Sequence, residues 1–114
     1  MKRAAWLLCL LLCALPLHAA TIDRVEPANW WVGMQHRQVE LMLYGRDIAA
    51  LQARIAHPGV RVTGVQALDN PNYLFVTVEI DADARPGSLQ VELLDGERVA
   101  ARHPWRIEAR EPAP

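Results

Sequence analysis

Cysteine and lysine are absent from the sequence after residue 20. Both cysteines, Cys9 and Cys13, and the only lysine, Lys2, lie before that point. No disulfide can therefore cross-link residues 21–114, and the hydrophobic core alone must stabilise them. These residues keep ten arginines against thirteen acidic side chains, a net charge of −3. A mildly acidic segment without a basic cluster lacks the electrostatic footprint of a protein that binds nucleic acid or an anionic membrane.

The first twenty residues have the pattern of a secretory signal peptide. Lys2 and Arg3 precede an unbroken apolar run over residues 6–15, and the small residues Ala19 and Ala20 follow. The run is too short to span a membrane. We therefore expect cleavage after Ala19 or Ala20 and export to the periplasm or the exterior of a bacterial cell, with no membrane attachment afterwards. The expected organisation is a signal peptide (1–20), one domain (21–110) and a Pro/Ala-rich tail (111–114).

Apolar residues alternate with polar ones in three long runs, at residues 39–43, 74–80 and 89–93. This period of two predicts strands that bury one face. Turn signals rich in Gly, Pro, Asn and Asp separate the runs, and short strands at such spacing are typical of an all-β antiparallel sandwich. Residues 48–52 fit a single helical turn as well as they fit coil. We expect about seven strands, at 22–26, 38–44, 52–56, 60–67, 73–80, 88–94 and 98–108.

Residue types that carry catalysis are scarce. Ser88 is the only serine, and it follows Pro86-Gly87 without the flanking glycines and helix of a nucleophile elbow. The three histidines after residue 20 lie far apart and lack zinc-ligand spacing. The sequence therefore predicts no catalytic residue, no zinc site and no cofactor.

Asp81-Ala82-Asp83, with Glu92 eleven residues after Asp81, invites comparison with a calcium-binding loop. The comparison fails because Arg85 stands where the loop needs a ligand and Pro86 stands where it needs glycine. A strand is also expected to begin before such a loop would close. The sequence therefore predicts no metal site here.

Trp30 and Trp31 are adjacent, and each indole can bury ~150–250 Å², or roughly 4–6 kcal/mol of transfer free energy. Successive side chains of an extended backbone point in opposite directions, so we expect one ring to enter the core and the other to face outward. An outward indole is either a contact for another protein surface or a platform for a ligand. The simplest alternative is that one ring fills the core while the other only covers it. Gly33 allows a tight bend after the pair, and Met34 can fill an irregular gap.

Several short motifs together resemble a known domain family. They are IDRVEP at 22–27, WWVGM at 30–34, LMLYG at 41–45, PGV at 58–60, DNPNYLF at 69–75 and PG at 86–87. This series is similar to the N-terminal domain of cyclomaltodextrinase-like glycoside hydrolases of the α-amylase superfamily, including exported bacterial members that also resemble neopullulanase. The resemblance covers essentially all of residues 21–110.

The resemblance implies an immunoglobulin-like (E-set type) sandwich that precedes a catalytic (β/α)₈ barrel. In that family the domain performs no chemistry, packs on the barrel, commonly supports dimerisation and helps to shape the entrance for α-glucans or cyclodextrins. A barrel needs ~250 residues, so we expect the catalytic acids to lie outside this sequence. The residues expected to contact another domain or a carbohydrate are Trp30, Trp31, Met34, Tyr44, Asn72 and Tyr73.

Three functions remain open from the sequence. The first is a non-catalytic accessory domain whose partner is an α-amylase-type catalytic domain or a second copy. The second is a free-standing periplasmic module that binds α-glucan or cyclodextrin, and the third is a structural or adaptor sandwich. For Tyr44 and Tyr73, simple cross-strand aromatic packing is the alternative to a contact role.

Overall fold

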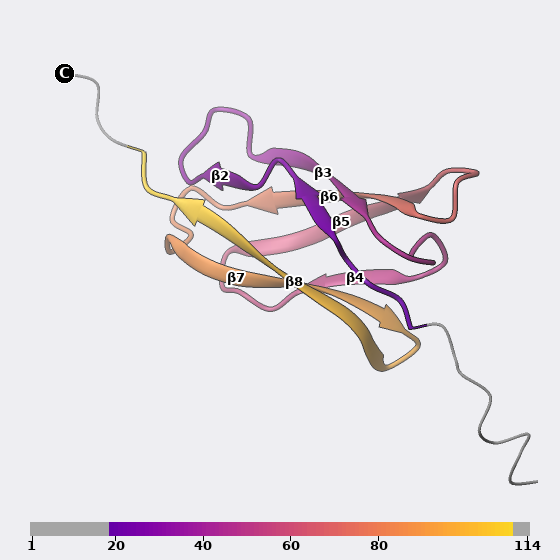
Figure 1. The fold of residues 1–114 in the computed structure, drawn as a ribbon. Helices are drawn as coiled ribbons and strands as arrows, with labels where there is room; N and C mark the ends of the chain where they lie inside the picture. The colour runs from indigo at the N-terminus through magenta and orange to yellow at the C-terminus, as the bar shows by residue number, and fades with distance from the viewer. Residues whose placement is uncertain (1–18, 111–114) are drawn as a thin grey trace, which may run out of the picture.

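The computed structural model describes residues 19–110, so most of the expected signal peptide and all of the expected tail lie outside it. Between these limits the chain forms eight strands and no helix, and hence no helix that could cross a membrane. The strands pack as two four-stranded sheets (Figure 1), which confirms the predicted β-sandwich. The strands are β1 (Arg24–Glu26), β2 (Asn29–Trp31), β3 (Gln38–Tyr44), β4 (Gln52–Ile55), β5 (Val60–Ala67), β6 (Tyr73–Ile80), β7 (Gly87–Asp95) and β8 (Arg98–Glu108).

The strand order is that of an immunoglobulin-like sandwich. The first sheet has the order β1-β3-β6-β5, and the second has the order β2-β8-β7-β4. With β2 set aside, these orders correspond to the ABED and CFG sheets of the constant-type immunoglobulin fold. The chain crosses from the first sheet to the second between β1 and β2, so that one N-terminal path contributes an edge strand to each sheet.

Strand β2 is the element that the sequence did not predict. Its three residues show no apolar alternation, and they are extended because they pair with the last strand, with Trp31 opposite Glu108. The pairing is parallel, unlike that of the other neighbouring strands, because β2 continues the direction of β1 alongside β8. The structure therefore has eight strands where about seven were expected, and the additional strand is the short parallel strand β2.

The segment at 48–52 is a turn and does not form a helix. The Leu51 N–H donates to the Ile48 carbonyl at 3.1 Å, which closes a single turn before β4 begins. Ile48 is fully buried and fixes this turn to the core. The apolar spacing that suggested a helix therefore comes from a turn whose residue Ile48 is buried in the core.

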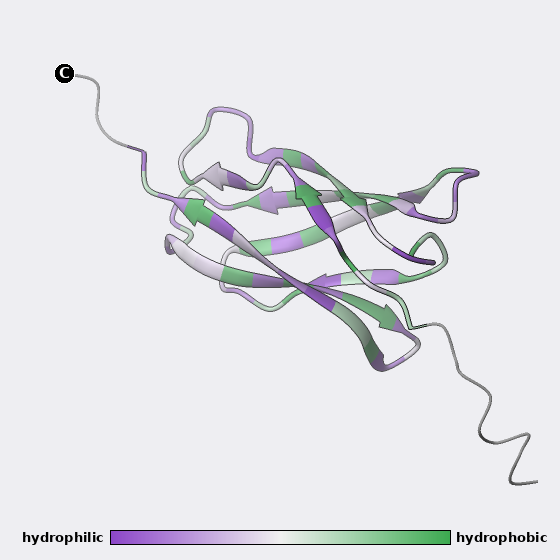
Figure 2. Cartoon of the chain, in the orientation of Figure 1, coloured by the Kyte–Doolittle hydropathy of each residue, from purple (hydrophilic) through white to green (hydrophobic). Residues whose placement is uncertain are grey.

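The three predicted inward faces form the core. Alternate residues of β3, β6 and β7 are buried, and Figure 2 shows this alternation as green bands between paler and purple ones along the strands. Within residues 19–110 no polar or charged side chain is buried. Among the described residues, Trp105 of β8 is the one aromatic side chain in the buried core. Its indole N–H donates a hydrogen bond to the Pro27 carbonyl at 2.9 Å. Trp105 thereby ties the crossing between the two sheets to the interior.

Two candidate binding surfaces at opposite ends of the sandwich

Trp30 and Trp31 lie on edge strand β2 and form the first candidate surface together with Met34, here named the tryptophan surface. Trp30 packs against the core and is partly buried, whereas Trp31 is 38% exposed. Their ring centroids lie 5.6 Å apart and the ring planes are tilted by 55°. Trp31 is thus the outward ring expected from the sequence, whereas Trp30 packs against the core without being fully buried in it. Trp31 is therefore the ring that a partner can reach.

The loop after the tryptophans bends at Gly33, whose φ of +78° lies in the left-handed region that favours glycine. This confirms the bend expected from the sequence. The Arg110 guanidinium donates to the Gly33 carbonyl at 3.2 Å, so the end of the described chain lies against this loop. Met34 and Arg110, with two polar side chains of the loop, line an open hollow of about 530 Å³. The surface is thus less uniformly apolar than the Gly-Met pair alone predicts.

The tryptophan surface adjoins the point where the chain leaves the sandwich. The Val32 N–H donates to the Glu108 carbonyl at 2.9 Å and extends the β2–β8 pairing by one bond. Trp31 consequently sits beside the last residues of β8. A domain that follows this one in a longer chain would emerge next to an exposed indole.

Tyr44 and Tyr73 form the centre of the second candidate surface. They are opposite each other on β3 and β6, with ring centroids 5.1 Å apart and planes tilted by 53°. The cross-strand packing considered from the sequence is therefore real, yet Tyr44 remains 36% exposed. Arg24, opposite Tyr44 on β1, places its guanidinium carbon 5.8 Å from the centroid of that ring.

Two further apolar side chains extend this pair over the outer face of the first sheet, and a third follows the end of the neighbouring strand β5. Met42 and Phe75 are partly buried cross-strand neighbours in the next row, and Leu68 after β5 is 52% exposed. None of the three was among the contact residues predicted from the sequence, although the alternation along a long strand marks its outward positions as clearly as its inward ones. We name this set the tyrosine surface: Met42, Tyr44, Leu68, Tyr73 and Phe75.

Asn72 lies at the margin of the tyrosine surface. Its side-chain oxygen accepts a hydrogen bond from the Asp47 N–H at 3.2 Å, and its carbonyl accepts one from the Gly45 N–H at 2.9 Å. These bonds join the turn after β3 to the turn before β6. A shallow pocket of about 180 Å³ opens there, lined by Asp23, Tyr44, Gly45, Arg46 and Asn72.

The two surfaces do not form one site. Residues 21–23 run beside Tyr44 and Arg46 at the end where the described chain begins, whereas Trp31 lies beside Glu108 at the end where it leaves. Figure 1 shows these two ends of the described chain, indigo and yellow, on opposite sides of the molecule. The six predicted contact residues therefore divide into the tryptophan surface, with Trp30, Trp31 and Met34, and the tyrosine surface with its margin, with Tyr44, Asn72 and Tyr73.

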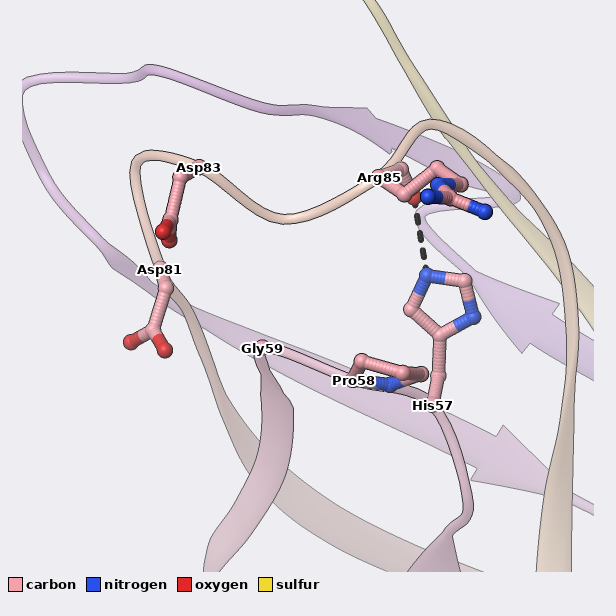
Figure 3. A pocket seen from close by; sticks show the side chains of 6 residues that line it. All are labelled: His57, Pro58, Gly59, Asp81, Asp83 and Arg85. Carbon is pink, nitrogen blue, oxygen red and sulfur yellow. Dashed lines mark hydrogen bonds between the residues drawn. The ribbon is translucent and has the colours of Figure 1, made fainter.

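A third hollow, of about 490 Å³, lies between the β4–β5 and β6–β7 connections (Figure 3). His57 Nε2 lies 2.8 Å from the Arg85 carbonyl oxygen on one side, and Asp81 and Asp83 lie on the other. The Asp81 carboxylate already pairs with the Arg61 guanidinium at 3.1 Å. In the part of the chain that the structure describes, no three His, Cys, Asp or Glu side chains gather into a metal site. Two of the polar side chains that line the hollow, His57 and Asp81, are therefore already engaged within the domain.

A cluster of three charged side chains lies on the outer face of the second sheet. Glu92 of β7 pairs with Arg102 of β8 at 2.9 Å and with Arg54 of β4 at 3.0 Å. Hydrogen bonds from Arg102 and then from Arg54 lower the pKa of the Glu92 carboxyl below its ordinary value of 4.5. One carboxylate thus bridges two guanidinium groups, and the three side chains form an ionic network that links β4, β7 and β8.

Among models of known protein families, the one described as cyclomaltodextrinase, N-terminal, matches residues 24–111. The matched range begins with β1 and ends just after β8, so it contains every strand of the sandwich. Both candidate surfaces lie inside it. The motifs noted in the sequence, the strand order and this match agree, and the chain belongs to the cyclomaltodextrinase N-terminal domain family.

Proposed function

We propose that this chain is a non-catalytic accessory domain of an exported glycosidase that degrades α-glucan and cyclodextrin, and that its tryptophan surface packs on the catalytic (β/α)₈ domain. The observation that carries the proposal is Trp31, which is exposed on an edge strand beside the exit of the chain. Family membership supports association with a catalytic domain.

The composition of the tryptophan surface fits a protein contact. Trp, Met and Arg are enriched at protein interfaces, and tryptophans dominate their binding energy. Trp30 and Trp31 pack against each other on β2, and Met34 and Arg110 line the hollow at the loop that follows. Each Å² of apolar surface removed from water contributes about 25 cal/mol, so covering the exposed part of Trp31 favours docking.

The test is binding to a cyclomaltodextrinase-type catalytic domain from the same organism, produced without its own N-terminal domain. The chain from Thr21 onward should form a complex in sedimentation and calorimetry. Trp31→Ala should weaken it at least tenfold, while Tyr44→Ala, at the opposite end, should not. Absence of a complex, or an unchanged affinity of Trp31→Ala, would contradict the proposal.

The free-standing α-glucan-binding module is the alternative that the same protein can test. Titration with maltoheptaose or β-cyclodextrin would then quench tryptophan fluorescence saturably, and Trp31→Ala would abolish the effect. The accessory-domain proposal predicts no such quenching at Trp31. It also predicts no release of reducing sugar from cyclodextrin, pullulan or maltooligosaccharides by the chain alone.

A further inference from the structure

A hollow of about 230 Å³ lies where the described chain begins, beside the hairpin between β7 and β8. Figure 1 shows the indigo start of the described chain next to that hairpin. Ala19 and Ala20 form part of the wall of the hollow, and Asp47, Asp95 and Arg98 supply its charged side chains. The hollow thus brings the expected cleavage point of the signal peptide together with charged groups from two turns.

The fold holds the chain from Ala20 onward. Ala20 is half-buried and packs against the core, whereas Ala19 is exposed. The Thr21 N–H donates to the Arg46 carbonyl at 3.3 Å, and the Thr21 hydroxyl oxygen accepts a hydrogen bond from the Arg46 N–H at 3.1 Å. Gly45 allows this close approach, because a Cβ atom there would lie 1.8 Å from the Thr21 carbonyl oxygen. The sandwich is therefore shaped to receive a chain that starts at Ala20.

The charged groups of the hollow do not balance. Asp95 and Arg98 pair at 3.4 Å across the hairpin. The Asp47 N–H donates to the Asn72 side-chain oxygen, but within residues 19–110 the Asp47 carboxylate accepts no hydrogen bond and joins no ion pair. Two carboxylates and one guanidinium leave one negative charge over, which attracts a neighbouring cation. The hollow therefore suits a positively charged group that can reach it.

We propose that this hollow binds the amino terminus of the mature chain, which cleavage after Ala19 creates. The proposal rests on the export that is part of the proposed function. Cleavage adds water across the Ala19–Ala20 amide: the Ala19 carbonyl carbon takes the hydroxyl group, and the Ala20 nitrogen takes the proton and becomes an amine. An α-amino group has a pKa of about 7.7–8.0, so it is mostly an ammonium ion at neutral pH. Because Ala20 already lies in the hollow, that ammonium supplies the missing positive charge for Asp47.

The packing selects Ala19 over Ala20 as the last residue of the signal peptide. The sequence alone leaves both bonds open. A cut after Ala20 discards a side chain that packs against the core. It also starts the chain at the Thr21 nitrogen, which already donates to the Arg46 carbonyl. A cut after Ala19 keeps both contacts and brings the new charge into the hollow.

The same arrangement requires cleavage to come before this segment docks. A signal peptidase must hold the residues on both sides of the bond in an extended conformation. In the folded domain Ala20 and Thr21, which directly follow the bond, are already engaged. Before cleavage the Ala20 nitrogen is an uncharged amide, so the Asp47 carboxylate lacks its ammonium partner. The mature domain is therefore more stable than its precursor, which favours an unfolded precursor during export.

The first experiment is expression of the full chain in a bacterial host, with intact mass measurement and N-terminal sequencing of the exported protein. We expect a product that begins at Ala20. A product that begins at Thr21 or elsewhere would overturn this inference and leave export intact, whereas an uncleaved chain retained in the cytoplasm would overturn export as well. The complex with the catalytic domain is measured with the chain from Thr21 onward, so docking is tested independently of this contact.

Acetylation of the terminal amine tests the ammonium contact itself. No lysine follows Lys2, so a chain that begins at Ala20 carries one amine, and an amine-directed reagent acetylates that group alone. Acetylation should lower the Tm at pH 7 by about 2–6 °C, as expected for one surface ion pair in a domain of this size. An unchanged Tm would overturn the contact.

Asp47→Asn identifies the partner of the ammonium. Asparagine removes the charge and tolerates the φ of +55° that Asp47 adopts. This variant should have a lower Tm, and acetylation should then have little further effect. Asp83→Asn is the matched control, because Asp83 is also an exposed loop carboxylate but lies in the hollow of Figure 3, and this variant should keep the full effect of acetylation. An equal effect of acetylation in the wild type and in Asp47→Asn would overturn the assignment.

Discussion

The tryptophan and tyrosine surfaces differ in how the fold supports them. Trp30 and Trp31 lie on a three-residue edge strand that pairs with β8 and follows a crossing held by the Trp105 indole. Tyr44 and Tyr73 lie on β3 and β6, which pair over seven residues in the middle of the first sheet. The tryptophan surface therefore depends on a few contacts with β8, at the C-terminal end of the described chain. The tyrosine surface depends only on the pairing of β3 with β6 in the first sheet.

Replacing Trp105 should give the largest effect and test this dependence directly. Trp105→Ala removes the largest core side chain, so it should reduce the free energy of unfolding by about 3–5 kcal/mol in urea titrations. Trp105→Phe keeps much of the volume but loses the hydrogen bond to Pro27. In hydrogen exchange this milder variant should expose the amides of β2 before those of β3 and β6. Uniform loss of protection would mean that the two surfaces are equally supported.

Gly45→Ala should destabilise the end of the sandwich that carries the tyrosine surface. A Cβ atom at Gly45 would lie 1.8 Å from the Thr21 carbonyl oxygen, and this backbone must move to accept it. Overpacking of this kind costs about 1–3 kcal/mol, and we expect the upper end. Gly64→Ala is the matched control, because its nearest neighbour would be the Thr77 side chain at 3.9 Å. The expected result is a clear drop in Tm for Gly45→Ala alone, with the segment before β1 displaced from the tyrosine surface.

Val76→Ala should destabilise the whole domain, and with it both surfaces, because Val76 lies in the core on the central strand β6. Val76 is fully buried, so we expect a loss of about 1–3 kcal/mol in the free energy of unfolding. Thr77 points to the outer face and is only partly buried, and Thr77→Ala should cost less. Equal losses in urea titrations would show that β6 buries the opposite face.

Glu92→Gln should have the smallest effect and leave both surfaces unchanged. The Glu92 pKa is lowered by Arg102 and Arg54, so the carboxylate stabilises the folded chain fully above its unfolded pKa. This contribution is lost as pH falls through the lower folded pKa. The urea midpoints of wild type and variant should therefore differ near neutral pH and converge below about pH 4.5. A difference that persists unchanged in acid would contradict this account.

The core and the tyrosine pair were predictable from the sequence because both follow from a local rule. Alternation in β3 and β6 placed Leu41 and Val76 inside and Tyr44 and Tyr73 outside before any pairing was known. Strand β2 was not predictable in this way, because its conformation comes from hydrogen bonds to a strand far along the chain. For the same reason the sequence identified the adjacent tryptophans but not their position beside the end of β8.

The parallel pairing of β2 with β8 has a mechanical consequence. The described chain begins at one end of the sandwich and leaves at the other (Figure 1), so tension between the two points pulls β2 and β8 in opposite directions along their length. The three residue pairs between them are then loaded in shear, all at once. Opening the sandwich from its ends requires these bonds to break together, and a tethered domain would resist stretching at the strand that carries Trp31.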